Sequence, residues 1–240
     1  MQAYLFLSPF LVFITVLYIL PAILTVIMAF TSLDSAFIWK FNGINNFRKI
    51  LMDPNTPIIA WNTVKYVGIT IFLTVVLDLF FAIMTTYFIR DERKGNIFKS
   101  ILMIPMITPG VVYSVLWLWL LEATPNGLAN KVYMALGGSE PLNWIAQYPF
   151  VIIIAATLLT SIAYGTTVFS SAVKSIPENQ FRAARVDGAT RIQTLVRIIV
   201  PCIKDTIATN TMLNTLSTLG VFGLIWALTG GGPGTKTTTL

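Results

Sequence analysis

Five long apolar stretches dominate this 240-residue chain and leave few folds open to it. They cover about residues 4–30, 64–89, 98–121, 149–173 and 203–228. A helix needs roughly 20 mostly apolar residues to cross about 30 Å of hydrocarbon. The composition is 55% hydrophobic and 11% charged, whereas a soluble domain carries about 25% charged residues. The sequence therefore predicts an all-α polytopic membrane protein, with a single transmembrane domain over residues 1–240 and bends at its prolines.

The basic residues set the expected orientation. Ten of the sixteen Lys and Arg residues lie in two connections, at 90–99 and 174–204. Because basic residues gather in cytoplasmic loops, we expect both connections and the N-terminus in the cytoplasm. The same rule accounts for the net charge of +6, so we expect no nucleic-acid partner.

This chain has few of the side chains that most often serve in catalysis or bind metals. The chain has no histidine and one cysteine, so a His-based metal site, proton relay or catalytic triad is excluded. We expect no catalytic residue, no metal site and no enzyme activity in this chain. The segment GGGPGTKT superficially suggests a phosphate loop. However, Thr235 precedes Lys236, whereas a phosphate loop needs Gly-Lys-[Ser/Thr] between a strand and a helix. We expect no cofactor bound by this chain.

The polar stretch at residues 175–201 predicts a helix, a sharp turn and a second helix. Ser175 and Glu178 have the spacing of a capping box, which begins a helix. That helix should end near Val186, because Gly188 reaches positive φ without a Cβ clash.

The second helix of this stretch should begin at another capping box, formed by Thr190 and Gln193. Pro201 should interrupt its backbone hydrogen bonds. Its apolar stripe recurs at helical spacing: Ile192, Leu195, Val196 and Ile199.

This stretch resembles the EAA loop of ABC importer permeases. The family pattern is Glu-Ala-Ala, three residues, Gly, nine residues and Ile-x-Leu-Pro; Ala183, Ala184, Gly188 and Ile198-x-Val200-Pro201 fit it, and Arg182 replaces the glutamate. The wider IPxxxxxAAxxDGA pattern is similar to the carbohydrate-uptake branch, typified by maltose and glycerol-phosphate permeases. FNGINNF after the first span and LTGGGP near residue 230 are also similar to segments of that branch.

The resemblance implies a coupling loop that docks on an ATPase. The residues it assigns to that contact are Arg182, Ala183, Ala184, Arg185, Asp187, Gly188 and Ala189. It also implies a second homologous permease subunit, two ATPase subunits that bind ATP and Mg, an extracytoplasmic solute-binding protein, and a location among the lipids of a prokaryotic inner membrane. The family has a sixth span, which we expect to follow residue 240.

Polar side chains within the spans are candidates for a solute path. The expected faces are Asn210, Asn214, Ser217 and Thr218 on the fifth span, Thr157, Ser161 and Tyr164 on the fourth, and Asp78 on the second. The same side chains can equally serve as polar contacts between helices, and we favour that role for Asp78.

The sequence thus predicts a permease subunit that translocates a sugar, oligosaccharide or polyol. Two alternatives stay open. Asp78, a carboxylate at membrane depth, is the best support for an ion-coupled secondary carrier. An ABC permease for amino acids or peptides is the other.

Overall fold

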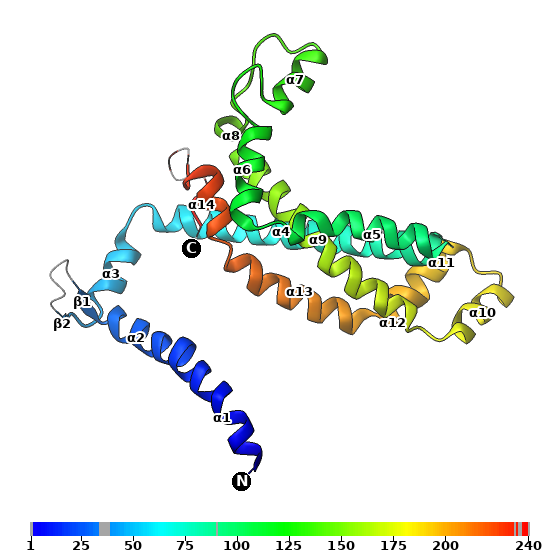
Figure 1. The fold of residues 1–240 in the computed structure, drawn as a ribbon, viewed down its shortest axis with the longest axis horizontal. Helices are drawn as coiled ribbons and strands as arrows, with labels where there is room; N and C mark the ends of the chain where they lie inside the picture. The colour runs from blue at the N-terminus through cyan, green and yellow to red at the C-terminus, as the bar shows by residue number, and fades with distance from the viewer. Residues whose placement is uncertain (1, 34–38, 90, 233, 235–236, 240) are drawn as a thin grey trace. The chain divides into compact units, whose positions relative to one another are not determined.

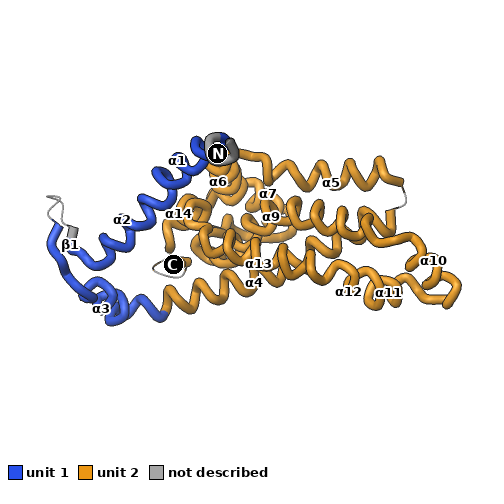
Figure 2. Tube along the Cα trace, turned by 90° about the horizontal axis from the view of Figure 1, so that it is seen from below, with its two compact units in different colours: residues 1–57 blue, residues 58–240 orange. Residues whose placement is uncertain are grey.

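The computed structural model describes residues 2–33, 39–89, 91–232, 234 and 237–239. Its contacts divide the chain into two compact units, Met1–Pro57 and Ile58–Leu240, coloured blue and orange in Figure 2. The single transmembrane domain expected from the sequence stays a prediction.

The elements follow one another as an almost entirely helical chain. In the first unit they are α1 (Gln2–Ile14), the π-helical turn η1 (Thr15–Ile19), α2 (Leu20–Ala29), β1 (Thr31–Leu33), β2 (Trp39–Phe41) and α3 (Asn45–Met52). Helix α4 (Thr56–Ile83) leads into the second unit. There follow η2 (Met84–Phe88), α5 (Glu92–Ile107), α6 (Gly110–Leu120), α7 (Leu128–Ala135), α8 (Trp144–Gln147), α9 (Pro149–Lys174), α10 (Glu178–Val186), α11 (Arg191–Thr194), η3 (Leu195–Ile199), α12 (Val200–Cys202), α13 (Lys204–Leu219) and α14 (Gly223–Thr229).

The first unit holds one apolar helix and a small hairpin. Phe6–Ala29 is long and apolar enough to cross a membrane, and none of its side chains is buried within the chain. A π-helical turn precedes Pro21, where a regular helix would lack a backbone donor. The antiparallel pair β1–β2 is a short exception to the all-α expectation. Asn46 of α3 donates hydrogen bonds to the carbonyls of Ala29 and Thr31, which holds α3 against the hairpin.

The second unit is a bundle of long helices, with α10 and α11 at one end and α6, α7 and α8 at the other (Figure 1). Two apolar clusters hold it together. One surrounds Tyr66, Ile153 and Ile225, and the other packs Val173 of α9 against Ile199 and Ile203.

The expected spans are present as three long helices and two bent pairs. Thr56–Phe88 and Pro149–Lys174 are the long apolar helices of the second unit. Helices α5 and α6 meet at 97° across a short break, and α13 and α14 meet at 49°. Counting each bent pair as one span gives up to five spans over the described residues, by length and composition.

The two breaks have different causes. Thr108 and Pro109 are extended, as expected because a proline disfavours helical geometry in the residue before it. The sequence predicted this kink. The break at 220–222 contains no proline, and the sequence analysis missed it.

The glycine-rich segment after α14 folds back on itself where it is described. Gly230 caps α14 at φ +58°. Thr237 is buried and donates to the Gly232 carbonyl at 2.9 Å. Pro233, Thr235 and Lys236 lie outside the described residues, so the absence of a phosphate loop stays a prediction from the sequence. Arg90, in the connection between the second and third spans, also lies outside them.

Candidate functional site

The coupling segment, residues 175–201, begins differently from the sequence prediction. Helix α10 has Pro177 at its N-cap, and no side chain caps it there. The predicted Ser175 cap is wrong, because α9 continues to Lys174 and makes Ser175 its C-cap. The Ser175 hydroxyl donates instead to the carbonyl of Ala172 at 2.8 Å.

The turn after α10 forms at Gly188, as the sequence predicted. Its φ is +69°. The N–H of Ala189 donates to the carbonyl of Ala184 at 2.9 Å, and that of Gly188 to Arg185 at 3.2 Å. These two bonds form a Schellman motif, which ends a helix at a residue with positive φ. The chain therefore reverses sharply at this glycine.

The second helix begins at the predicted capping box. Gln193 N–H donates to the Thr190 hydroxyl at 3.2 Å, and the Gln193 side chain accepts from the Thr190 N–H at 2.8 Å. The π-helical turn η3 then precedes Pro201, as η1 precedes Pro21. The residues of the predicted apolar stripe differ in burial. Ile199 is fully buried, whereas Ile192 and Val196 are 70% and 61% exposed.

Helix α10 presents a basic and partly apolar outer face. Arg185 donates to Glu178 at 2.7 Å, whereas Arg182 lies 3.9 Å from the same carboxylate and keeps 74% of its side chain exposed. Ala184 is buried within the segment, whereas Val186 is 87% exposed. The exposed side chains of this face are therefore available to a partner.

Aromatic contacts connect the coupling segment to the end of the second span. The rings of Phe181 and Tyr87 stack with centroids 6.0 Å apart. The Arg191 guanidinium lies 5.7 Å from the centre of the Phe88 ring. The coupling segment therefore contacts η2 through two aromatic rings.

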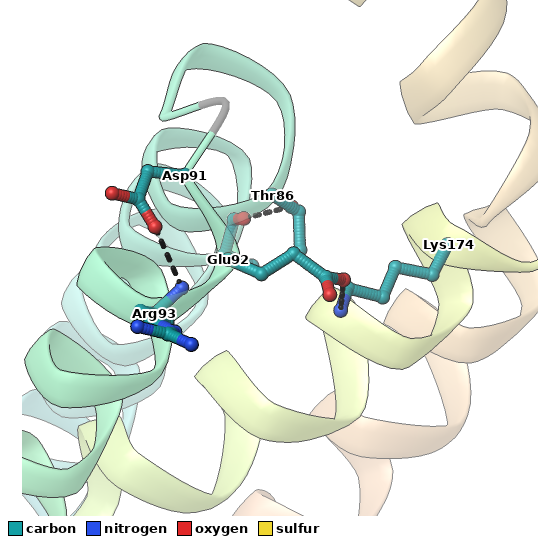
Figure 3. A network of polar contacts seen from close by, with 6 residues as sticks. Thr86, Asp91, Glu92, Arg93 and Lys174 are labelled. Carbon is teal, nitrogen blue, oxygen red and sulfur yellow. Dashed lines mark hydrogen bonds and ion pairs between the residues drawn. The ribbon is translucent and has the colours of Figure 1, made fainter.

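An ion pair links the last residue of α9 to the first residue of α5. Lys174 donates to Glu92 at 2.9 Å, and Asp91 caps α5 by accepting from the Arg93 N–H at 2.9 Å (Figure 3). Glu92 precedes the apolar part of its span. The Lys174 ammonium holds the pKa of the Glu92 carboxyl below its ordinary value.

A cavity of about 750 Å³ lies between α6, α9, α13 and α14. Its polar lining comes from three spans: Tyr113, Ser114, Thr157, Thr160, Ser161, Asn214, Ser217 and Thr218. Most of the remaining lining is apolar, and no charged residue is among the described residues that line it.

The hydrogen bonds around this cavity leave capacity for a ligand. Thr160 and Ser161 both donate to the carbonyl of Thr157, at 2.9 Å each, so their oxygens remain able to accept. The Asn214 amide nitrogen has no hydrogen-bond partner among the described residues. The cavity therefore offers several hydroxyl acceptors, and an unpaired amide nitrogen lies buried beside its lining.

Three predicted path residues lie outside this lining. Asp78 and Asn210 are buried, at 0% and 2% exposure. Tyr164 is 46% exposed. The structure thus brings together Asn214, Ser217 and Thr218 with Thr157 and Ser161.

The sequence of this chain matches the model of one protein family over residues 78–240, which is more than half of the chain. That family is described as the binding-protein-dependent transport system inner membrane component. This chain belongs to that family. The matched range contains the coupling segment and every residue that lines the cavity.

Two of three curated relatives match this permease over nearly its whole length, and the third over most of it. The trehalose/maltose transport system permease protein MalF of Thermococcus litoralis is 28% identical over 99% of this chain and 80% of its own. The sn-glycerol-3-phosphate transport system permease protein UgpA of Salmonella typhimurium is 27% identical over 99% of this chain and 80% of its own length. The xylose/arabinose import permease protein XacH of Haloferax volcanii is 34% identical over 70% of this chain and 52% of its own length.

A solved structure shares the fold of this permease. A chain in the crystal structure of a bacterial ABC transporter that imports the acidic polysaccharide alginate superposes with a TM-score of 0.85 at 22% identity. The match covers 99% of this chain and 79% of that one. The helical polytopic fold expected from the sequence is thereby confirmed.

Sequence reasoning missed part of the permease cavity. Tyr113 and Ser114 of α6 line it, and the Tyr113 hydroxyl donates to the Ala156 carbonyl at 2.7 Å. Their signal was present in the sequence, because two hydroxyl side chains follow Pro109-Gly110 inside an otherwise apolar span. Thr160 of α9 was missed in the same way.

Proposed function

We propose that this chain is a transmembrane permease subunit of an ATP-driven ABC importer, and that it translocates a sugar, oligosaccharide or polyol across a prokaryotic cytoplasmic membrane. The observation that carries the proposal is the family match over residues 78–240, which includes both the coupling segment and the cavity. The family assignment decides against an ion-coupled secondary carrier.

The solute class is supported by relatives and by the cavity. The names of three relatives specify trehalose/maltose, xylose/arabinose and sn-glycerol-3-phosphate. A sugar hydroxyl both donates and accepts hydrogen bonds, which suits the Asn214 amide and the hydroxyls of α9. An amino acid or peptide would bring an ammonium and a carboxylate, and the described lining offers no charge to either. The same lining offers no charge to a phosphate, so among the solutes of the three relatives it suits the uncharged sugars best.

The coupling segment gives the proposed mechanism its moving part. Helix α10 docks on an ATPase subunit with its basic outer face against acidic groups. Closure of the ATPase pair around ATP and Mg displaces α10. The Phe181–Tyr87 contact passes this displacement to the second span, and the bundle then opens the cavity to one side of the membrane and afterwards to the other.

The proposed assembly contains this chain, a second homologous permease subunit, two ATPase subunits and an extracytoplasmic solute-binding protein. Nucleotide binds to the ATPase subunits, and the coupling segment and the N-terminus face the cytoplasm. The dependence on a binding protein follows from the family, and a related assembly is known in complex with a periplasmic protein that binds an alginate pentasaccharide.

Uptake by reconstituted vesicles tests the proposal. Vesicles holding the four membrane-associated subunits should accumulate a labelled sugar from a panel only when ATP is inside and the binding protein outside. A catalytically inactive ATPase provides the control. Uptake without ATP that an uncoupler abolishes would overturn the proposal.

A further inference from the structure

A buried carboxyl that has no charged partner in the described part of the chain lies among the helices of the second unit. Asp78 of α4 has 0% exposure, and neither of its oxygens has a hydrogen-bond partner among the described residues. The ion pairs found there all involve other side chains. The side chain of Asn210 in α13 lies beside this carboxyl, and its amide oxygen and nitrogen are also unpaired.

Gly165 of α9 makes room for the carboxyl. A Cβ atom at this position would lie 1.7 Å from the Oδ2 of Asp78 and 2.2 Å from its Cγ. The carboxyl therefore rests against the backbone of α9, so that α4, α9 and α13 meet at Asp78. Gly68 of α4 has no neighbour within 4 Å of the same position and provides a matched control.

The protonation of Asp78 decides whether these groups can satisfy one another. A charged carboxylate inside a membrane bundle is costly unless it faces a partner or water, and Asp78 is not among the residues that line the cavity. An ionised carboxylate only accepts hydrogen bonds, whereas a neutral one also donates. A neutral Asp78 can donate to the Asn210 Oδ1 while its second oxygen accepts from the Asn210 Nδ2.

We propose that Asp78 carries a proton in the assembled permease and forms this reciprocal pair with Asn210. The pair ties α4 to α13 one helical turn from Asn214, which lines the cavity. Asp78 is thus a positioning residue that fixes the polar face of α13 rather than a group that touches the solute. The inference does not depend on which solute is carried.

Isosteric substitution gives the first test, in the complete transporter with its partner subunits. Asp78→Asn keeps one donor and one acceptor in place, so uptake and thermal stability should stay at the wild-type level. Asp78→Leu should lower uptake roughly tenfold or more, because it leaves Asn210 buried without a partner. Gly165→Ala should resemble Asp78→Leu, and Gly68→Ala should resemble the wild type. An assembled Asp78→Asn transporter without uptake would overturn the inference.

Infrared spectroscopy tests the proton itself and does not depend on how Asp78→Leu folds. In neutral buffer, exposed carboxyls are ionised, so few protonated C=O bands remain. The wild-type minus Asp78→Asn difference spectrum should show such a band, shifted in heavy water. A difference spectrum with only an ionised carboxylate band at that pH would contradict the inference.

Discussion

The ring of Phe181 in α10 stacks on that of Tyr87 in η2, with 6.0 Å between centroids and 27° between planes. This contact joins α10 of the coupling segment to the end of a membrane span. The two residues are 94 positions apart, so nothing in the local sequence indicated the contact.

Phe181→Ala should loosen the connection between ATP hydrolysis and transport. Loss of an aromatic pair costs about 0.5–1.5 kcal/mol beyond buried area. We expect the ATPase to stay bound and active while uptake per ATP hydrolysed falls several-fold in reconstituted vesicles. Phe181→Tyr preserves the stacked ring and should restore the ratio. An unchanged ratio in Phe181→Ala would remove this contact from the coupling route.

Gly188→Val should abolish uptake while leaving membrane insertion intact. The φ of +69° at this residue is strained for a side chain with a Cβ, at about 1–2 kcal/mol, and more for a β-branched one. Gly188→Asn is the matched control, since asparagine tolerates this conformation and should retain most uptake. Normal uptake by the valine variant would show that the turn is dispensable.

Arg182→Glu should weaken co-purification of the ATPase roughly tenfold or more, because like charges facing each other across an interface repel. Arg182 suits this test because it is largely exposed and only loosely held by Glu178. Arg93→Glu is the control: it makes the same change of charge in the other basic connection, outside the coupling segment. Equal recovery of the ATPase with both variants would argue against an acidic surface opposite α10.

Asn214→Leu should lower uptake roughly tenfold, because the solute loses a hydrogen bond within the cavity. Binding of the ATPase should not change, since Asn214 lies on α13, away from α10. Met212→Leu alters an exposed position of the same helix and should behave as the wild type. If Asn214→Leu transports normally, the cavity is not the solute path.

The Glu92–Lys174 ion pair should make a small, pH-dependent contribution to stability. The pKa of Glu92 is lowered in the folded chain, so the contribution is present above the ordinary glutamate range and is lost as the pH falls through the lowered pKa. Thermal midpoints of wild type and Glu92→Gln should differ slightly at neutral pH and converge in acid. Both groups are exposed, and added salt should also remove the difference.

Much of the architecture could be predicted from local pattern. Helical spans follow from the length of apolar stretches, and the turn at Gly188 follows from glycine's access to positive φ. The capping box at Thr190 also follows from the sequence. The prediction that Ser175 caps the start of α10 was wrong because a serine can stand at either end of a helix. The structure shows that Ser175 stands at the end of α9.

The cavity was harder to predict because it depends on how helices turn against one another. Asn210 and Asn214 share one helical face, yet Asn210 is buried against Asp78 and Asn214 lines the cavity. The bend between α13 and α14 is another such feature. Periodicity places side chains on a face, but tertiary packing decides what that face meets.

Cysteine cross-linking at Val186 tests the central claim that the coupling segment meets an ATPase. Val186 is 87% exposed on α10. In a Cys202→Ser background, Val186→Cys in the native membrane should form a cross-link through a short bifunctional reagent. We predict that mass spectrometry of the product will identify an ATPase subunit, and that Ile97→Cys will give no such product. A Val186→Cys variant that reacts fully with the reagent but never joins an ATPase would contradict the account.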